Sequence, residues 1–146
     1  VFCYADEFGK PILKNSDKNF SISHSRGLVT VIISDFLVGI DIQEITPKIQ
    51  RIAHKFMREE ETQSLDTNKS LEHLHIFWGA KESLYKAYGK KELDFRQHIF
   101  VEPFDYLSKG EAKGKVQKAN FDMDFKIHFE EIEQHYLVFA EAFTSE

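Results

Sequence analysis

The chain has 146 residues, which is enough for one domain with a substantial core and too few to argue for two. Fourteen phenylalanines are spread along it, a composition that speaks against a disordered chain. The formal net charge of −5 argues against non-specific binding of nucleic acid through a basic surface. We therefore expect a compact protein with no nucleic-acid partner.

The apolar segments are too short to span a membrane. The most apolar one, residues 29–42, is interrupted by Ser34, Asp35 and Gly39. The single Cys3 cannot close an intrachain disulfide, which fits a reducing compartment. We predict a cytoplasmic protein without membrane association. Because the chain starts at Val1 rather than at methionine, we also expect that a segment precedes it.

In chain order, the first predicted element is a loop over residues 9–19, which is rich in turn-forming residues. Three short strands follow, at 20–24, 28–34 and 37–43, each marked by alternating or β-branched apolar residues. Turn-forming residues separate these strands and favour an antiparallel arrangement.

Helices are predicted in the middle of the chain. Thr46 and Pro47 indicate a helix start, and a shorter helical piece is expected near Leu65. The strongest helical pattern covers residues 71–88 and ends at Gly89.

The last third of the chain returns to β-type patterns, and four strands are predicted there: 99–104, 113–117, 121–130 and 135–142. Helices grouped in the middle, with antiparallel strands on both sides, indicate an α+β fold.

The strand around residue 40 carries two oxygen donors on one face. Because side chains alternate along a strand, Asp41 and Gln43 share a face, roughly 6.6 Å apart. Gly39 lies next on that face and leaves room for a ligand to approach the backbone. Oxygen donors beside a glycine suit a magnesium–phosphate site, although solvent-facing polar residues at a strand end would give the same pattern.

The long predicted helix places a charge among apolar residues. Lys81 falls in the middle of the apolar arc, about 60° from Trp78, while Glu82 and Lys86 lie at its edge. A lysine in such a position must extend to the surface, form an ion pair or contact a ligand. A surface ion pair would explain Glu82 and Lys86, but it would not explain Lys81.

These residues form part of a known signature. The sequence resembles the 4′-phosphopantetheinyl transferases of the surfactin-synthetase-activating type in five motifs, which occur in the family's order: Gly9-Lys10-Pro11, Phe20-Ser21-Ile22-Ser23-His24-Ser25, Gly39-Ile40-Asp41, Ile52-Ala53-His54-Lys55-Phe56-Met57 with Glu61, and Trp78-Gly79-Ala80-Lys81-Glu82-Ser83 with Lys86. The strand-rich tail to residue 142 is compatible with this family but carries no motif.

The resemblance implies a pseudo-dimeric fold of two similar α+β halves, with coenzyme A in the cleft between them. Residues 1–36 would then be the end of the first half, and residues 37–146 would be the second half, which carries the metal motif. We treat both parts as one compact domain. The chain lacks most of the first half of a longer family member, and this leaves apolar surface that could drive formation of a homo-oligomer.

The resemblance also implies an activity. The enzyme would transfer the phosphopantetheine arm of coenzyme A to a serine of an acyl or peptidyl carrier protein, with magnesium, and release adenosine 3′,5′-bisphosphate. Asp41, Glu82 and Gln43 would hold the metal, although many family members have glutamate at the position of Gln43. An amide brings no charge, so we expect weaker metal binding.

The other motif residues would hold the coenzyme and assist the transfer. Lys81 and Lys86 would neutralise the phosphates, with Lys86 also assisting the departing group, and Glu61 would be the base for the carrier serine. The nucleotide end would be held by Lys10, Ser23 and His24. A carrier protein, typically acidic, would need a local basic patch, for which the candidates are Lys90, Lys91, Lys113, Lys115 and Lys118.

Two alternatives remain open from the sequence. The chain could bind coenzyme A or a carrier without transferring anything, which the absent front part and Gln43 favour. It could also be a magnesium-dependent phosphohydrolase, although such enzymes usually need more carboxylates than this sequence offers. For His24, a hydrogen-bonded core histidine is an alternative to a ligand, since it follows Phe20 and Ile22 on one face of the same strand.

Overall fold

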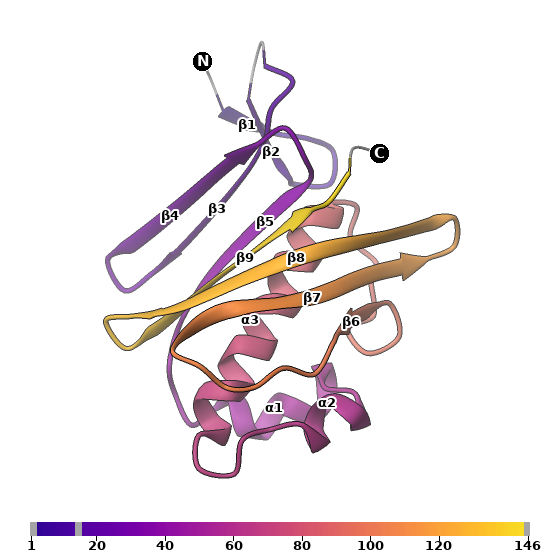
Figure 1. The fold of residues 1–146 in the computed structure, drawn as a ribbon. Helices are drawn as coiled ribbons and strands as arrows, with labels where there is room; N and C mark the ends of the chain where they lie inside the picture. Colours follow the sequence, from indigo (N-terminus) through magenta and orange to yellow (C-terminus); the bar gives the residue numbers. More distant parts are fainter. Residues whose placement is uncertain (1–2, 14–15, 145–146) are drawn as a thin grey trace.

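The computed structural model describes residues 3–13 and 16–144. Two small antiparallel sheets precede a five-stranded antiparallel sheet, which is covered on one face by helices (Figure 1). This arrangement confirms the predicted α+β class. Within the described residues, no helix has the length and apolar character needed to cross a bilayer.

The small sheets pair β1 (Cys3–Ala5) with β2 (Pro11–Leu13) and β3 (Asn19–Ser25) with β4 (Leu28–Ser34). The large sheet has the order β5 (Val38–Glu44), β9 (His135–Ala142), β8 (Phe121–Ile132), β7 (Lys109–Lys118) and β6 (Ile99–Val101). The helices are α1 (Ile49–Phe56), α2 (Glu59–Gln63) and α3 (Ser70–Tyr88).

Most predicted elements are present, with shifted ends. Gly89 ends α3 in a left-handed conformation (φ 72°), which glycine adopts without strain. The predicted strand at 99–104 stops at residue 101, two residues before Pro103, whose ring nitrogen cannot donate to a ladder. The predicted loop at 9–19 contains the short strand β2, and α2 begins earlier than its expected position near Leu65.

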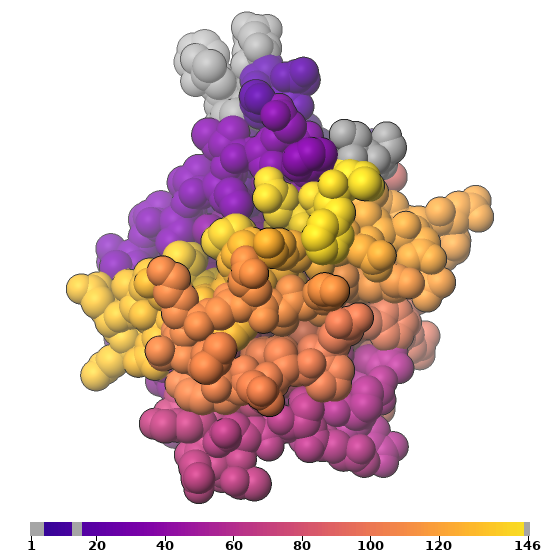
Figure 2. Space-filling model, in the orientation of Figure 1, coloured from indigo at the N-terminus to yellow at the C-terminus, as the bar shows by residue number. Residues whose placement is uncertain are grey.

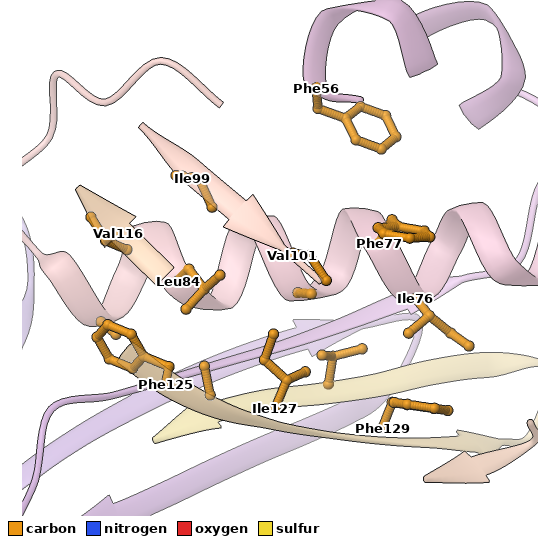
Figure 3. Packing of buried hydrophobic residues seen from close by; sticks show 14 of the residues in the cluster. Phe56, Ile76, Phe77, Leu84, Ile99, Val101, Val116, Phe125, Ile127 and Phe129 are labelled. Atoms are coloured by element: carbon orange, nitrogen blue, oxygen red, sulfur yellow. The ribbon is translucent and has the colours of Figure 1, made fainter. Parts of the chain in front are cut away.

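The core lies between α3 and the large sheet. Ile76 and Leu84 of α3 are fully buried and point toward Phe125, Ile127 and Phe129 on β8 (Figure 3). Each such side chain contributes about 1.5–3 kcal/mol when it leaves water. On the opposite side of α3, Phe77 and Phe56 of α1 complete the same cluster, so α3 is enclosed and its orientation is fixed.

Two glycines allow α3 to approach the sheet closely. A Cβ atom on Gly39 of β5 would lie 1.8 Å from the backbone oxygen of Ser83, which is far inside contact distance. A Cβ on Gly79 of α3 would lie 2.5 Å from the Val138 side chain on β9. The Ser83 hydroxyl donates to the Val138 carbonyl at 3.0 Å and joins the helix to the sheet. The faces of β5 and α3 that carry the motif residues are therefore in direct contact.

The β3–β4 hairpin is attached to the outer edge of β5 through side chains. The backbone N–H groups of Ile40 and Ile42 donate to the hydroxyls of Ser21 (3.0 Å) and Ser23 (3.1 Å). These bonds satisfy buried donors that no backbone carbonyl of β3 reaches. The hairpin consequently continues the sheet laterally without a regular ladder.

Candidate active site

The contact between β5 and α3 brings three of the predicted site residues together. Asp41 of β5 is 4% exposed, and its Oδ1 atom lies 3.6 Å from the ammonium of Lys86 on α3. Lys86 also donates to the carbonyl of Ile40 at 2.8 Å. Glu82, one helical turn before Lys86, lies close enough for the Asp41 charge to affect its ionisation.

The ionisation of both carboxyl groups is perturbed. Burial raises the pKa of Asp41, and the neighbouring Lys86 only partly opposes this effect. Burial together with the charge of Asp41 raises the pKa of Glu82 to about 7, from an ordinary value near 4.5. Two carboxylates with one lysine between them leave excess negative charge in a partly buried place, where a divalent cation would be stabilised.

The Asp41 carboxylate has one unsatisfied oxygen among the residues that the structure describes. Asp41 Oδ2 is buried and forms no hydrogen bond to the described residues, which costs free energy unless a ligand or water completes it. Gln43 shares the face predicted for it, since its Nε2 atom lies 3.4 Å from Asp41 Oδ1. The donor set of two carboxylates and an amide is chemically suited to Mg²⁺, which takes oxygen ligands and usually keeps several waters.

The cluster is not a complete metal cage. Among residues 3–13 and 16–144, no group of three or more histidine, cysteine or acidic side chains is positioned to hold a metal. A cation here would therefore take part of its coordination from water or from phosphate oxygens, as is usual for magnesium bound together with a phosphorylated substrate.

A basic cavity of about 210 Å³ adjoins Lys86. Its lining includes Lys10 from the loop before β2, Lys86 from α3, and Lys91 from the segment after α3. The Lys10 ammonium donates to the carbonyl of Ala87 at 3.0 Å, so that its position is fixed against the end of α3. A neighbouring cavity of about 300 Å³ also includes Lys10 and adds Lys18 and Lys90. Such a lysine-rich depression attracts phosphate groups.

A larger cavity of about 430 Å³ lies elsewhere, beside Arg58, Glu60 and Asp94. We do not assign it as the active site, because three acidic side chains line it and one of its two arginines, Arg58, already pairs with Glu60 at 2.7 Å. None of the predicted site residues lines it. The smaller cavity, lined by Lys10, Lys86 and Lys91, has the chemistry of a phosphate site, and Lys86 connects it to Asp41.

Lys81 does not face the aspartate-bearing strand, and this corrects the prediction. Its ammonium is fully buried, lies 3.0 Å from Glu61, and donates to the carbonyls of Phe95 (2.9 Å) and Ile99 (2.7 Å). An ammonium has three donors, and all three are used inside the protein. Lys81 is thus the buried, paired lysine that the sequence left as one of three options, and no donor remains for a phosphate.

Glu61 is equally enclosed. It is 1% exposed, its Oε1 atom accepts from the Arg58 N–H at 2.8 Å and contacts Lys81, and its Oε2 atom accepts from the Val101 N–H at 2.9 Å. Both carboxylate oxygens are therefore occupied by partners within the chain. The structure does not bring Glu61 to the Asp41 cluster, contrary to the expectation of an accessible base near the metal.

The motif residues on β3 also differ from expectation. The Ser23 hydroxyl is buried and accepts from Ile42, so its visible role is to hold the hairpin on β5. His24 is exposed on the outer face of the hairpin and lines neither lysine-rich cavity. The alternative of a core histidine is wrong for His24. Its contact with a nucleotide stays a prediction.

Sequence reasoning missed several groups that line the smaller cavity. Tyr85 and Phe8 contribute ring surface there, and Lys91 had been considered only for carrier docking. Tyr85 lies one residue before Lys86 on the helix, and helical periodicity alone does not show that its ring lines a cavity. The contact of residues 8–10 with the end of α3 is long-range, and no local signal indicates it.

Comparison with known proteins gives this geometry its context. A family model described as the 4′-phosphopantetheinyl transferase superfamily matches residues 37–142. This chain belongs to that superfamily. The matched segment contains Asp41, Glu82 and Lys86, whereas Lys10, Ser23 and His24 precede it.

Two curated proteins are similar to this superfamily member. The 4′-phosphopantetheinyl transferase gsp of Aneurinibacillus migulanus is 32% identical over 134 residues, which cover 90% of this chain and 54% of that protein. The 4′-phosphopantetheinyl transferase psf-1 of Bacillus pumilus is 34% identical over 86 residues, which cover 56% of this chain and 37% of that protein. The matches thus span about half of the first relative and about a third of the second. The division of this chain at residue 37 stays a prediction.

Proposed function

We propose that this chain transfers 4′-phosphopantetheine from coenzyme A to a serine of an acyl or peptidyl carrier protein and releases adenosine 3′,5′-bisphosphate. The observation that carries the proposal is the unsatisfied carboxylate oxygen of Asp41, which lies in a cluster with Glu82 and Lys86, and Lys86 in turn lines a lysine-rich cavity. Membership of the superfamily supports the reaction class, as do the names of the two relatives.

Asp41 and Glu82 would hold Mg²⁺, with Gln43 as a weaker third donor. The unsatisfied oxygen of Asp41 and the mutual repulsion of the two carboxyl groups are the features that a divalent cation would relieve. When bound, the ion would supply positive charge to the pyrophosphate of coenzyme A as its phosphoanhydride bond breaks.

The lysines would orient the coenzyme. Lys86 stands between Asp41 and the cavity, where its ammonium can bind a phosphate oxygen and donate a proton to the departing adenosine bisphosphate. Lys10 and Lys91 would bind the remaining phosphates. In the reaction, the serine oxygen forms the new bond to phosphorus, the anhydride oxygen leaves with the adenosine moiety, and the serine proton is released.

Glu61 receives no catalytic role in this proposal. Its oxygens are occupied by Lys81 and by two backbone N–H groups, so accepting a serine proton would require breaking a buried ion pair. Lys81 is excluded from the phosphate contacts for the same reason. We assign both residues to the support of α3.

The carrier protein would dock beside the cavity. Of the lysines considered from the sequence, Lys115 pairs with Asp122 at 3.4 Å and Lys118 donates to the Glu92 carbonyl. Lys91 instead lines the cavity that contains Lys86, and Lys90 lines the neighbouring cavity, which shares Lys10 with it. An acidic carrier that approaches this end of α3 would bring its serine near the phosphates.

The test is intact-mass analysis of an apo carrier protein incubated with this chain, coenzyme A and Mg²⁺. A mass gain of one phosphopantetheine is expected with the unchanged chain, and its loss is expected with Glu82→Gln. Glu72→Gln is the matched control, because Glu72 lies in the first turn of the same helix, remote in sequence from Lys86. A carrier modified equally by the Glu82→Gln variant would contradict the site.

A second candidate function is binding of coenzyme A without transfer, which is favoured by Gln43, because its amide adds no negative charge beside Asp41. It predicts heat of coenzyme A binding in calorimetry and no mass gain on the carrier. A phosphohydrolase would instead consume coenzyme A in the absence of a carrier, which chromatography of the nucleotide products detects.

A further inference from the structure

The side chain of Lys10 lies across Gly89 at the end of α3. A Cβ atom on Gly89 would be 2.5 Å from Lys10 Cδ and 3.1 Å from the Lys10 ammonium nitrogen, and both distances are shorter than ordinary contacts. The ammonium donates to the carbonyl of Ala87, in the last turn of the helix, at 3.0 Å. Lys10 therefore occupies the space that a side chain at position 89 would fill.

The backbone of Lys10 is held by a tight turn between β1 and β2. Asp6 Oδ1 accepts from the N–H groups of Phe8 at 2.8 Å and Lys10 at 2.9 Å, and the Asp6 N–H donates to the Lys10 carbonyl at 2.9 Å. Figure 1 shows the β1–β2 hairpin beside the end of α3, and Figure 2 shows the first described residues, in indigo, at one end of the molecule. Because the turn fixes the backbone, the direction of the Lys10 side chain depends on what it meets at the helix end.

Lys10 and Gly89 line both lysine-rich cavities described above. The cavity of about 210 Å³ combines them with Lys86, and the neighbouring cavity of about 300 Å³ combines them with Lys90. A charge at the boundary of two cavities contributes to the positive potential of each. The position of the Lys10 ammonium, which is set at Gly89, therefore affects the affinity of both cavities for phosphate groups.

We propose that Gly89 is a positioning residue for Lys10. The absence of a side chain at position 89 lets Lys10 lie across the helix end, where its ammonium binds a phosphate of the substrate. This inference rests on the part of the proposed function in which Lys10 binds a phosphate of coenzyme A. It assigns Gly89 a second role beside ending α3, for which its left-handed conformation (φ 72°) is sufficient.

Asparagine at position 89 separates the two roles of the glycine. Asparagine adopts the left-handed conformation more readily than other residues with a side chain, so Gly89→Asn keeps the end of α3. Its Cβ atom nevertheless meets Lys10 Cδ, which belongs to a flexible side chain that can rotate away. We therefore expect Gly89→Asn to displace the Lys10 ammonium from Ala87 while the helix stays folded.

Transfer kinetics with coenzyme A as the varied substrate test this proposal. Gly89→Asn should raise the KM for coenzyme A about tenfold and change kcat less than about twofold, because a contact made equally in the ground state and the transition state affects KM alone. Lys10→Ala should have a similar effect. Adding Gly89→Asn to Lys10→Ala should raise KM no further, since the displaced contact is already absent.

Gly27→Asn is the matched control. Gly27 also has a positive φ, of 83°, but a Cβ there meets nothing within 4 Å, so the KM for coenzyme A should not change. Thermal unfolding of all variants shows that they fold. If Lys10 only capped the negative end of the α3 dipole, Gly89→Asn and Lys10→Ala would lower thermal stability and leave KM unchanged, which would overturn the proposal.

Calorimetry with coenzyme A, in the absence of a carrier, separates this inference from the proposed transfer. A chain that binds coenzyme A more weakly after Gly89→Asn, but modifies no carrier, would support the role of Gly89 and contradict the transfer. A chain that modifies the carrier, but binds coenzyme A equally well after Gly89→Asn, would overturn the role of Gly89 alone. Absence of coenzyme A binding by the unchanged chain would overturn both.

Discussion

The ammonium of Lys81 and the carboxylate of Glu61 lie 3.0 Å apart, and both groups are almost completely removed from solvent. The pair joins α3 to α2 and, through the carbonyls of Phe95 and Ile99, to the segment that leads into β6. Burial lowers the pKa of Lys81 to about 8, with Glu61 opposing that shift, so the lysine is mostly protonated at pH 7. The helix that carries Glu82 and Lys86 is thereby anchored on the side away from β5.

Breaking this pair should destabilise the protein strongly. Lys81→Met leaves the Glu61 carboxylate buried without its counter-ion and should cost about 3–5 kcal/mol. The double variant Glu61→Gln with Lys81→Met should cost clearly less than the sum of its parts, because no buried charge remains. Urea unfolding of the four proteins in the cycle measures the coupling.

The exposed pair of Lys69 and Glu72, at 3.7 Å, is the control for that cycle. Its lysine side chain is 54% exposed, so its coupling should be below about 1 kcal/mol. If the losses in unfolding free energy from the Glu61 and Lys81 substitutions were strictly additive, the two charges would not stabilise each other.

The stability of the metal-free protein should depend on Glu82. The folded-state pKa of about 7 lies above the ordinary value near 4.5, so between these values the folded chain binds more protons than the unfolded chain. The protonated Glu82 side chain therefore contributes to the free energy of unfolding at low pH. This contribution, up to about 3 kcal/mol, is lost as the pH rises through the folded-state pKa near 7. Glu82→Gln should be more stable than the unchanged chain at pH 8 and about equal at pH 4.

Thermal unfolding in the presence of a chelator measures this difference. Adding Mg²⁺ at pH 8 should stabilise the unchanged chain more than Glu82→Gln, because the variant keeps only one of the two carboxylates that would hold the ion. If Glu82→Gln were less stable than the unchanged chain at pH 8, burial of the Glu82 charge could not be what raises its pKa.

Gln43→Glu should leave transfer activity equal or raise it when magnesium is limiting. The substitution adds a negative charge next to Asp41, to which Gln43 now contributes only an amide 3.4 Å away. Initial rates at a series of Mg²⁺ concentrations should show a lower half-saturating concentration. Severe loss of activity with a normally folded variant would argue against the placement of Gln43 beside the metal.

Gly39→Ala should be strongly destabilising, by about 3 kcal/mol or more. The new methyl group would lie 1.8 Å from the Ser83 oxygen and 2.9 Å from the Ala87 nitrogen, which are backbone atoms of α3 that cannot rotate away. Chemical denaturation measures the loss. Gly27→Asn provides the comparison: a Cβ at Gly27 meets nothing within 4 Å, and asparagine tolerates its positive φ, so the cost should stay below about 1 kcal/mol. Similar costs at both positions would mean that α3 does not approach β5 this closely.

The sequence was sufficient for the local features of this protein. Alternation along residues 38–44 placed Gly39, Asp41 and Gln43 on one face, and helical spacing placed Glu82 and Lys86 one turn apart. Side chains alternate along every strand and repeat every 3.6 residues along every helix, so these placements depend only on residues that are close in the sequence. The order of the five motifs was likewise enough to indicate the family, and the family model confirmed it.

Only the tertiary structure decided which partner each charged group meets. Lys81 and Glu82 are neighbours in sequence, yet the first pairs with Glu61 in the interior and the second lies close to Asp41. The helical pattern shows that Lys81 points inward, but not which buried group lies opposite, because that depends on how α2 and the segment before β6 pack on α3. Burial and long-range packing determine these partners. A charge that is removed from water needs an ion pair or hydrogen bonds, and the groups available for them are those that the tertiary structure places beside it.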